Sequence, residues 1–141
     1  MRDYTKIEAW RLADDLTVAV YEHTRFFPKE EIYGLTSQLR RTAYSVPANV
    51  VEGALRESKK DYLHFLYIAR GSLAETQYFI HLARRLGYLS LDEAERLAGQ
   101  TKLTFACLHG FDSGSRERSW EVEQIHCDND ESNCDWLDSL V

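Results

Sequence analysis

The sequence predicts an all-α protein: an antiparallel, up-down four-helix bundle followed by an acidic C-terminal tail. Three stretches of the S/T-x-x-D/E form, which caps the first turn of a helix, each stand just before a run of apolar residues at spacings of three and four. No segment alternates apolar and polar residues as a half-buried strand would. The 141 residues include only two prolines and seven glycines, which favours long elements joined by short loops. We therefore expect residues 1–112 to form the bundle and residues 113–141 to form an acidic segment that is either a flexible tail or carries a short extra helix over residues 119–125.

The first helix is expected to begin at Thr5. The stretch Thr5-Lys6-Ile7-Glu8 has the capping-box form, in which the hydroxyl and the carboxylate each accept a hydrogen bond from a free backbone N–H. Its apolar stripe contains Ile7, Trp10, Ala13, Leu16, Val20 and Tyr21. The helix should end before Pro28, because the residue ahead of a proline disfavours the α conformation. Residues 28–34, PKEEIYG, predict a turn or a short helical turn.

The remaining three helices follow from the same signals. The second is expected over residues 35–56. The third should begin at the capping stretch that opens with Ser58 and end near Gly87, a residue suited to a left-handed C-terminal position. The fourth should begin at the capping stretch that opens with Ser90 and continue to about Gly110. Because the connections between these helices are only a few residues long, neighbouring helices must pack antiparallel.

The net charge of −6 is concentrated in the tail. Of the 17 basic and 23 acidic residues, 15 of each kind lie in residues 1–112, so the bundle is neutral overall. Residues 113–141 carry two basic and eight acidic residues, interspersed with apolar ones that include Trp120 and Trp136. A neutral body with an acidic tail that also carries tryptophans suggests a tail that docks onto something.

The chain carries no signal for a membrane or for secretion. No apolar run approaches the roughly 20 residues needed to cross a bilayer, and the first ten residues contain no apolar signal segment. Three cysteines are too few for a disulfide framework. We therefore expect a cytoplasmic protein without membrane contact.

Enzymatic and metal-binding patterns are mostly missing. A di-metal bundle needs two Glu-x-x-His motifs on its helices, and the one such motif, Glu123–His126, falls in the tail. Zinc bound by His126, Cys127 and Cys134 would lack a C-x-x-C pair and a fourth ligand, so two surface thiols are the simpler interpretation. No nucleophile elbow, P-loop or dinucleotide-binding motif occurs. We expect no catalytic residue, no metal and no cofactor.

Seven cations are candidates for binding nucleic acid or another acidic partner. One group lies at the turn between the second and third helices, and two arginine pairs lie toward the opposite end. The candidates are Arg40, Arg41, Arg56, Lys59, Lys60, Arg84 and Arg85. Binding to phosphates requires several cations on one face, which a ring of identical subunits would multiply. The alternative is that these cations are solvated or form local ion pairs.

The second helix contains a proline within an otherwise regular apolar stripe. Pro47 removes one backbone donor and crowds the carbonyl of Ala43, which should bend the helix. Thr42 and Ser45 are the expected donors to the freed carbonyls. A small, polar face of this helix, formed by Gln38, Arg41, Ser45, Ala48 and Glu52, suggests a contact with another helix or subunit. A catalytic role for Asn49 and Glu52 is the weaker alternative.

If the second and third helices form an antiparallel hairpin turning near residues 57–58, specific pairs should face each other. Arg41 should lie at the level of Glu75 and form an interhelix ion pair with it. Ser45 should lie near Gly71 and Ser72. The small residues there would let the two backbones approach closely.

These residues also carry a resemblance to a known family. The strings FPKEEIYGLTSQLRRTAYSVPANVVEG (27–53), SKKDYLHFLYIARGSLAETQ (58–77) and LGYLS (86–90), with the N-terminal Trp10, resemble the bacterial 23S rRNA-intervening-sequence proteins. The resemblance spans about Tyr4 to Phe111. It implies an antiparallel four-helix bundle that assembles as a homopentamer. A related accessory variability protein of diversity-generating retroelements forms a similar five-fold barrel and is thought to bind nucleic acid and a reverse transcriptase.

The resemblance implies architecture and no catalytic residue. The residues that carry it over are Pro47, Asn49, Glu52, Gly53, Gly71 and Ser72, with Glu75 as the expected partner of Arg41. The tail of residues 113–141 and the neutral body depart from the family pattern.

Two functions remain as hypotheses. The first is a non-enzymatic, oligomeric adaptor, expected as a homopentamer, that binds RNA, DNA or a nucleic-acid-processing enzyme. The second is a protein–protein interaction module that works through the acidic tail, with Trp120 and Trp136 as anchors. A further alternative is that the tail folds back onto the basic turn and masks it.

Overall fold

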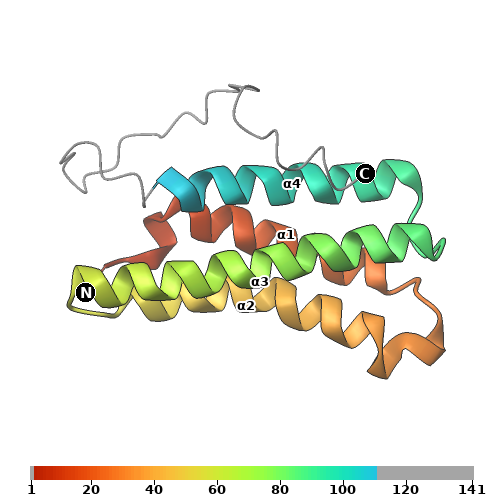
Figure 1. The fold of residues 1–141 in the computed structure, drawn as a ribbon, viewed down its shortest axis with the longest axis horizontal. Coiled ribbons are helices and arrows are strands. Elements are labelled where there is room, and N and C mark those ends of the chain that lie inside the picture. Colours follow the sequence, from red (N-terminus) through yellow and green to blue (C-terminus); the bar gives the residue numbers. More distant parts are fainter. Residues whose placement is uncertain (1, 111–141) are drawn as a thin grey trace.

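The computed structural model describes residues 2–110, and its four helices run in the predicted order (Figure 1). They are α1 (Glu8–Thr24), α2 (Leu35–Ala54), α3 (Lys59–Arg85) and α4 (Leu91–Gly110). Two short 3-10 turns, η1 (Tyr4–Lys6) and η2 (Lys29–Tyr33), precede α1 and α2. No strand occurs among residues 2–110, so the predicted all-α bundle is confirmed.

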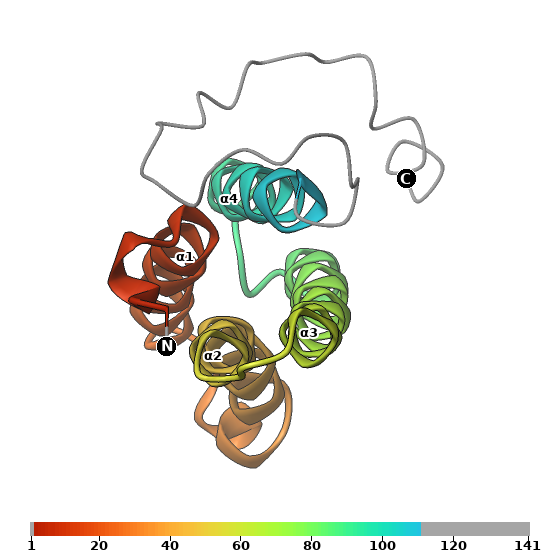
Figure 2. The same cartoon turned by 90° about the vertical axis from the view of Figure 1, so that its left-hand side faces the viewer.

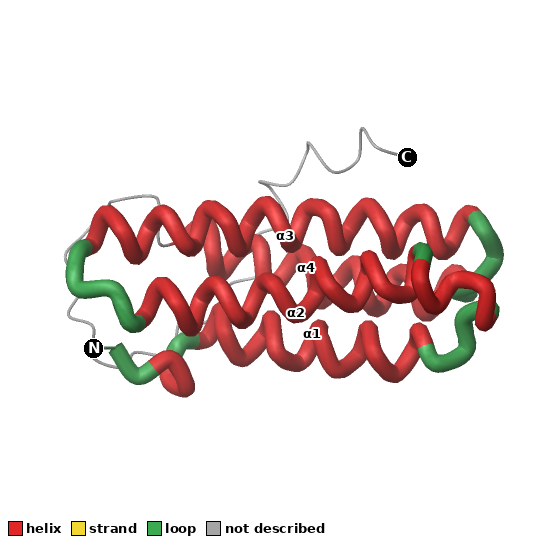
Figure 3. Tube along the Cα trace, turned by 90° about the horizontal axis from the view of Figure 1, so that it is seen from below, coloured by secondary structure: helices red, strands yellow, loops and turns green. Residues whose placement is uncertain are grey.

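Each helix is antiparallel to its neighbours in the chain, and α4 closes the bundle against α1 (Figures 2 and 3). The pairs in contact are α1 with α2, α2 with α3, α3 with α4, and α4 with α1, which leaves α2 and α4 diagonally opposed. The core is filled by aliphatic side chains, among them Leu16, Val20, Leu39, Val46, Val50, Leu66, Leu73, Ile80, Leu97 and Leu108. Leu16 and Val20 belong to the stripe predicted for the first helix, and the members on the other helices also recur at helical separations of four, seven or eleven residues, which gives each helix one face to bury.

Two of the three predicted capping sequences begin a helix as expected. The Ser58 hydroxyl accepts a hydrogen bond from the Asp61 N–H (3.0 Å) at the start of α3. At the start of α4, the Ser90 hydroxyl accepts from the Glu93 N–H (3.2 Å), and the Glu93 carboxylate accepts from the Ser90 N–H (2.8 Å). These are the reciprocal bonds of a capping box.

The prediction that Thr5 caps the first helix is wrong. Asp3 accepts hydrogen bonds from both the backbone N–H (3.1 Å) and the hydroxyl (2.6 Å) of Thr5. Residues 4–6 therefore form the separate turn η1, and α1 begins later, at Glu8, with no side-chain cap on Ile7. The sequence signal failed because a carboxylate two residues earlier engages the hydroxyl that would have capped the helix.

The ends of the other helices are fixed by local backbone geometry. Gly87 has a φ of 77°, the left-handed conformation expected after α3, and Tyr88 N–H donates to the Ala83 carbonyl (2.9 Å). Before α2, the Glu31 carboxylate accepts from the Leu35 N–H (2.8 Å) and from the Tyr88 hydroxyl (3.1 Å). Glu31 thus caps α2 and ties η2 to the end of α3.

Pro47 is buried inside α2, and the helix continues through it without a break. The first turns of α2 lean outward relative to its later turns in Figure 2. Since Pro47 has no N–H, it cannot donate to the Ala43 carbonyl. The hydroxyl of Thr17 on α1 reaches that carbonyl instead (3.1 Å) and shares its one proton between it and the Ala13 carbonyl (2.8 Å). The predicted donors are engaged elsewhere, because Thr42 donates to the Leu39 carbonyl (3.1 Å) and the Ser45 hydroxyl pairs with another helix.

The contact of Ser45 on α2 with Ser72 on α3 confirms the predicted register of these two helices. The hydroxyls of Ser45 and Ser72 lie 2.9 Å apart, and Asn49 Nδ2 donates to the Ser45 carbonyl (2.7 Å). The close approach of the two helices occurs at Gly53, however, where an added Cβ would lie 2.9 Å from the Cβ of Phe65. Gly71 is exposed, and a Cβ there would meet nothing within 4 Å, so its predicted role in close packing is wrong.

The predicted Arg41–Glu75 ion pair is also absent from the described residues. Both side chains are exposed, and Arg41 makes a long hydrogen bond to Gln38 on its own helix (3.5 Å). Matching levels along two helices did not produce a pair, because exposed long side chains gain little from being held together.

Candidate nucleic-acid interface

Four cations gather where α2 turns into α3, and we call this group the basic end. It consists of Arg2, Arg56, Lys59 and Lys60. The sequence predicted the last three as a cluster, and the chain brings the fourth from its N-terminus, since Arg2 N–H donates to the Ala54 carbonyl (3.1 Å) at the end of α2. Arg2 was missed because nothing in the sequence indicates that the segment before η1 folds back onto the α2–α3 turn.

The two arginines of the basic end are held against aromatic rings. The Arg2 guanidinium lies 4.5 Å from the ring centre of Tyr62, and the Arg56 guanidinium lies 4.7 Å from that of Phe65. Arg2 Nη1 also donates to the carbonyl of Arg56 (3.2 Å), just past the end of α2. These contacts orient the two charges, because a cation over an aromatic face is stabilised without losing all of its N–H donors.

Acidic residues at the same end are mostly engaged locally. Glu52 accepts from Arg56 (2.7 Å), Asp61 accepts from the Ser58 hydroxyl (2.6 Å), and Asp3 lies 3.8 Å from Lys6. Glu57 is exposed. Within the described part of the chain, Lys59 and Lys60 are exposed and take part in no ion pair. They are therefore the cations of the basic end that are available to a ligand.

The other predicted cations do not join this group. Arg40 is half-buried between α1 and α2: its Nε donates to the Thr24 hydroxyl (2.8 Å), and its guanidinium lies 4.6 Å from the ring centre of Tyr21. Arg84 and Arg85 are exposed in the last turn of α3, at the opposite end of the bundle. The seven candidate cations thus divide between the two ends of the bundle, and Arg40 is held in the α1–α2 interface by Thr24 and Tyr21.

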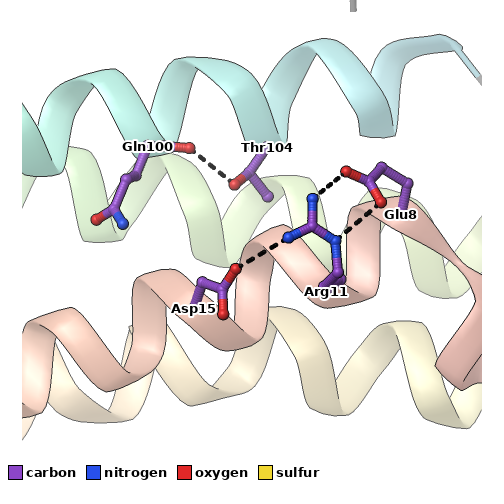
Figure 4. Close-up of polar contacts among 5 residues, drawn as sticks. All are labelled: Glu8, Arg11, Asp15, Gln100 and Thr104. Carbon is purple, nitrogen blue, oxygen red and sulfur yellow. Dashed lines mark hydrogen bonds and ion pairs between the residues drawn. The ribbon is translucent and has the colours of Figure 1, made fainter. Parts of the chain in front are cut away.

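Arg11 on α1 is a cation that its own helix neutralises (Figure 4). It forms an ion pair with Glu8 and a second one with Asp15 (3.3 Å). The Arg11 guanidinium holds the pKa of Glu8 below its usual range. On the neighbouring α4, the Thr104 hydroxyl donates to the Gln100 carbonyl (2.8 Å).

Residues 2–110 contain no group of three or more His, Cys, Asp or Glu side chains that could hold a metal ion. The zinc ligands considered from sequence, in the stretch from His126 to Cys134, lie outside the described residues.

His23 on α1 lies 3.5 Å from Glu93 on α4. The pKa of Glu93 is held below its usual value, chiefly by hydrogen bonds with the backbone N–H and hydroxyl of Ser90 and to a smaller extent by His23. None of the helices described is both long and apolar enough to cross a membrane.

Comparison with known proteins identifies the family. A sequence model of the 23S rRNA-intervening sequence proteins matches residues 5–110, which is the whole bundle. The chain belongs to this family. The matched range ends where α4 ends, so residues 111–141 lie beyond the part that the family shares. No curated protein matches the chain.

The fold of this intervening-sequence protein is similar to that of a solved relative. The crystal structure of a protein of unknown function from the S23 ribosomal protein family of Bacteroides thetaiotaomicron superposes with a TM-score of 0.70. The match covers 74% of this chain and 98% of that one, at 20% sequence identity. At that identity the likeness supports the bundle architecture alone.

Proposed function

We propose that this protein is a non-enzymatic, oligomeric adaptor that binds the phosphate backbone of nucleic acid through its basic end. The observation that carries the proposal is the grouping of Arg2 and Arg56, each held against an aromatic ring, beside Lys59 and Lys60, which form no ion pair within residues 2–110. Phosphate contacts of this kind supply affinity that is independent of base sequence. The family name, which refers to an intervening sequence in 23S rRNA, supports RNA as the first nucleic acid to test.

Assembly is part of this proposal. One subunit offers only a few cations at the basic end, which gives weak binding on its own, whereas a closed ring of identical subunits would repeat them around one axis. The resemblance to the family implies five subunits. Multi-angle light scattering at micromolar concentration tests this, with a pentamer as the expected result and a monomer as the result that refutes assembly.

RNA binding is tested by neutralising two matched pairs of exposed cations on the same helix. Lys59→Gln/Lys60→Gln removes two charges at the start of α3, and Arg84→Gln/Arg85→Gln removes two at its end. We expect the first variant to bind a structured RNA severalfold more weakly and the second to bind like the wild type. Equal losses in both variants would show general charge attraction, and no loss in either would refute the proposed surface. The lysine variant should fold normally, because cations at a helix N-terminus oppose the helix dipole.

A further inference from the structure

We propose that the acidic tail, residues 113–141, docks onto the basic end of the bundle and competes there with nucleic acid. The docking stands on the charges and positions described below. Only the competition rests on the proposed function.

The first argument is position. The helix α4 ends at Gly110, at the same end of the bundle as the α2–α3 turn (Figure 1). The α4 helix is a direct neighbour of α3, which begins with Lys59 and Lys60. Packed helices lie roughly 8–10 Å apart, and the ten residues from Gly110 to Trp120 can span up to about 33 Å. The tail therefore starts within easy reach of the basic end.

The second argument is charge. The tail carries eight acidic residues against Arg116 and Arg118, whereas residues 1–112 are balanced. The basic end offers Lys59 and Lys60 without ion pairs among the described residues. Of its acids, Glu52 pairs with Arg56, Asp3 lies 3.8 Å from Lys6, Asp61 accepts from the Ser58 hydroxyl, and Glu57 is exposed. Opposite charges attract appreciably when they approach within about 8–10 Å at ordinary ionic strength. The basic end therefore offers the tail two adjacent, exposed lysines that form no ion pair among the described residues, close to where the tail starts.

The third argument is apolar surface. Leu55, in the turn itself, leaves 51% of its surface exposed beside Arg56. In the tail sequence, Trp120 and Val122 alternate with the acidic residues Glu121 and Glu123. An indole next to carboxylates suits a site with an exposed leucine and nearby cations, because it can cover the leucine and stack on a lysine or arginine.

A segment tethered in this way acts as a competitor at high effective concentration. Short flexible tethers give effective concentrations in the millimolar range. Even a weak intramolecular contact would therefore reduce the apparent affinity of the basic end for phosphate.

Zero-length crosslinking of the full chain with a carbodiimide, followed by mass spectrometry, tests the docking directly. This reagent joins lysine amines to carboxylates that touch them. We expect tail carboxylates to link to Lys59 and Lys60 severalfold more often than to Lys29, an exposed lysine at the opposite end, and this preference to fade at high salt. Equal linking to both ends, or no tail links to Lys59 and Lys60, would overturn the proposal. Mixing isotope-labelled and unlabelled chains shows whether the tail reaches its own subunit or a neighbour, and either result upholds docking.

The competition is tested with a full-length variant in which Glu121→Gln, Glu123→Gln and Asp128→Asn halve the net charge of the tail, from −6 to −3. If the tail competes, this variant should bind RNA severalfold more tightly than the wild type at low salt. Unchanged RNA affinity would refute the competition, and the crosslinking result would still decide whether the tail docks. Tail crosslinks in a protein that binds no RNA would uphold docking and refute the proposed function.

Discussion

Replacing Thr17 with valine should destabilise the bundle, because Pro47 on α2 leaves the Ala43 carbonyl without a backbone donor and the Thr17 hydroxyl supplies one. Ala43 is fully buried, and its carbonyl receives no hydrogen bond from Pro47, so the Thr17 hydroxyl is its donor across the α1–α2 interface. Valine has the same shape without the hydroxyl. A buried carbonyl left without a partner costs about 1–3 kcal/mol. We expect the low half of that range, because the same hydroxyl also reaches the Ala13 carbonyl (2.8 Å).

The coupling to Pro47 separates this explanation from a simple loss of packing. In a Pro47→Ala background, the new N–H at position 47 can donate to the Ala43 carbonyl, since the two residues stand four apart in one helix. Thr17→Val should then cost less than about 0.5 kcal/mol, giving a coupling of roughly 1 kcal/mol, above the usual error of additivity. Urea unfolding followed by far-ultraviolet circular dichroism, at one fixed protein concentration, measures all four proteins.

Thr76 on α3 provides a matched control. Thr76 is buried, whereas Thr17 is half-buried, and the Thr76 hydroxyl donates within its own helix, to the Ser72 carbonyl (2.9 Å). No proline removes the backbone donor to that carbonyl, so Thr76→Val should cost less than Thr17→Val and show no coupling to Pro47→Ala. The same free-energy loss for Thr17→Val in both backgrounds would refute the reasoning.

Two further predictions concern the glycines of the bundle and the cap of α4. Gly53→Ala should lower the free energy of unfolding by up to about 2 kcal/mol, because overpacking against Phe65 outweighs the gain in helix propensity. Gly71→Ala should raise it by up to about 1 kcal/mol, because a Cβ there meets nothing and only the helix propensity improves. Equal urea midpoints for the two variants would contradict both predictions. Ser90→Ala should cost about 1 kcal/mol near neutral pH. Because the folded state lowers the pKa of Glu93, the stability that its carboxylate contributes is present above its unfolded pKa and is lost as the pH falls through the lower, folded value. The difference between wild type and Glu93→Gln should therefore shrink in acid, and a difference that is constant with pH would exclude that contribution.

The sequence predicted the regular parts of the fold because they depend on local chemistry. Helical spacing of apolar residues identified the core, and the hydroxyls of Ser58 and Ser90 identified two helix starts. Thr5 satisfied the same pattern and failed, because Asp3, outside the four-residue window, engages its hydroxyl. Capping patterns are therefore reliable only when no other side chain nearby can take the hydroxyl.

The less predictable features all depend on contacts between distant segments. The donor to the Ala43 carbonyl comes from α1, and the fourth cation of the basic end comes from the N-terminus. Antiparallel register predicted the Ser45–Ser72 contact, yet the same register misassigned the close approach to Gly71 rather than to Gly53. Register gives the level of a residue along a helix, and its rotation about the helix axis then decides whether it is buried.

The central claim, that Lys59 and Lys60 contact phosphates, is tested most directly by the salt dependence of RNA binding. The logarithm of the association constant is plotted against the logarithm of salt concentration for the wild type and for Lys59→Gln/Lys60→Gln. If each lysine neutralises one phosphate of a duplex, the variant's slope should be shallower by about 1.8 for every subunit in contact. An identical slope in both proteins would contradict the claim, even if the variant bound more weakly.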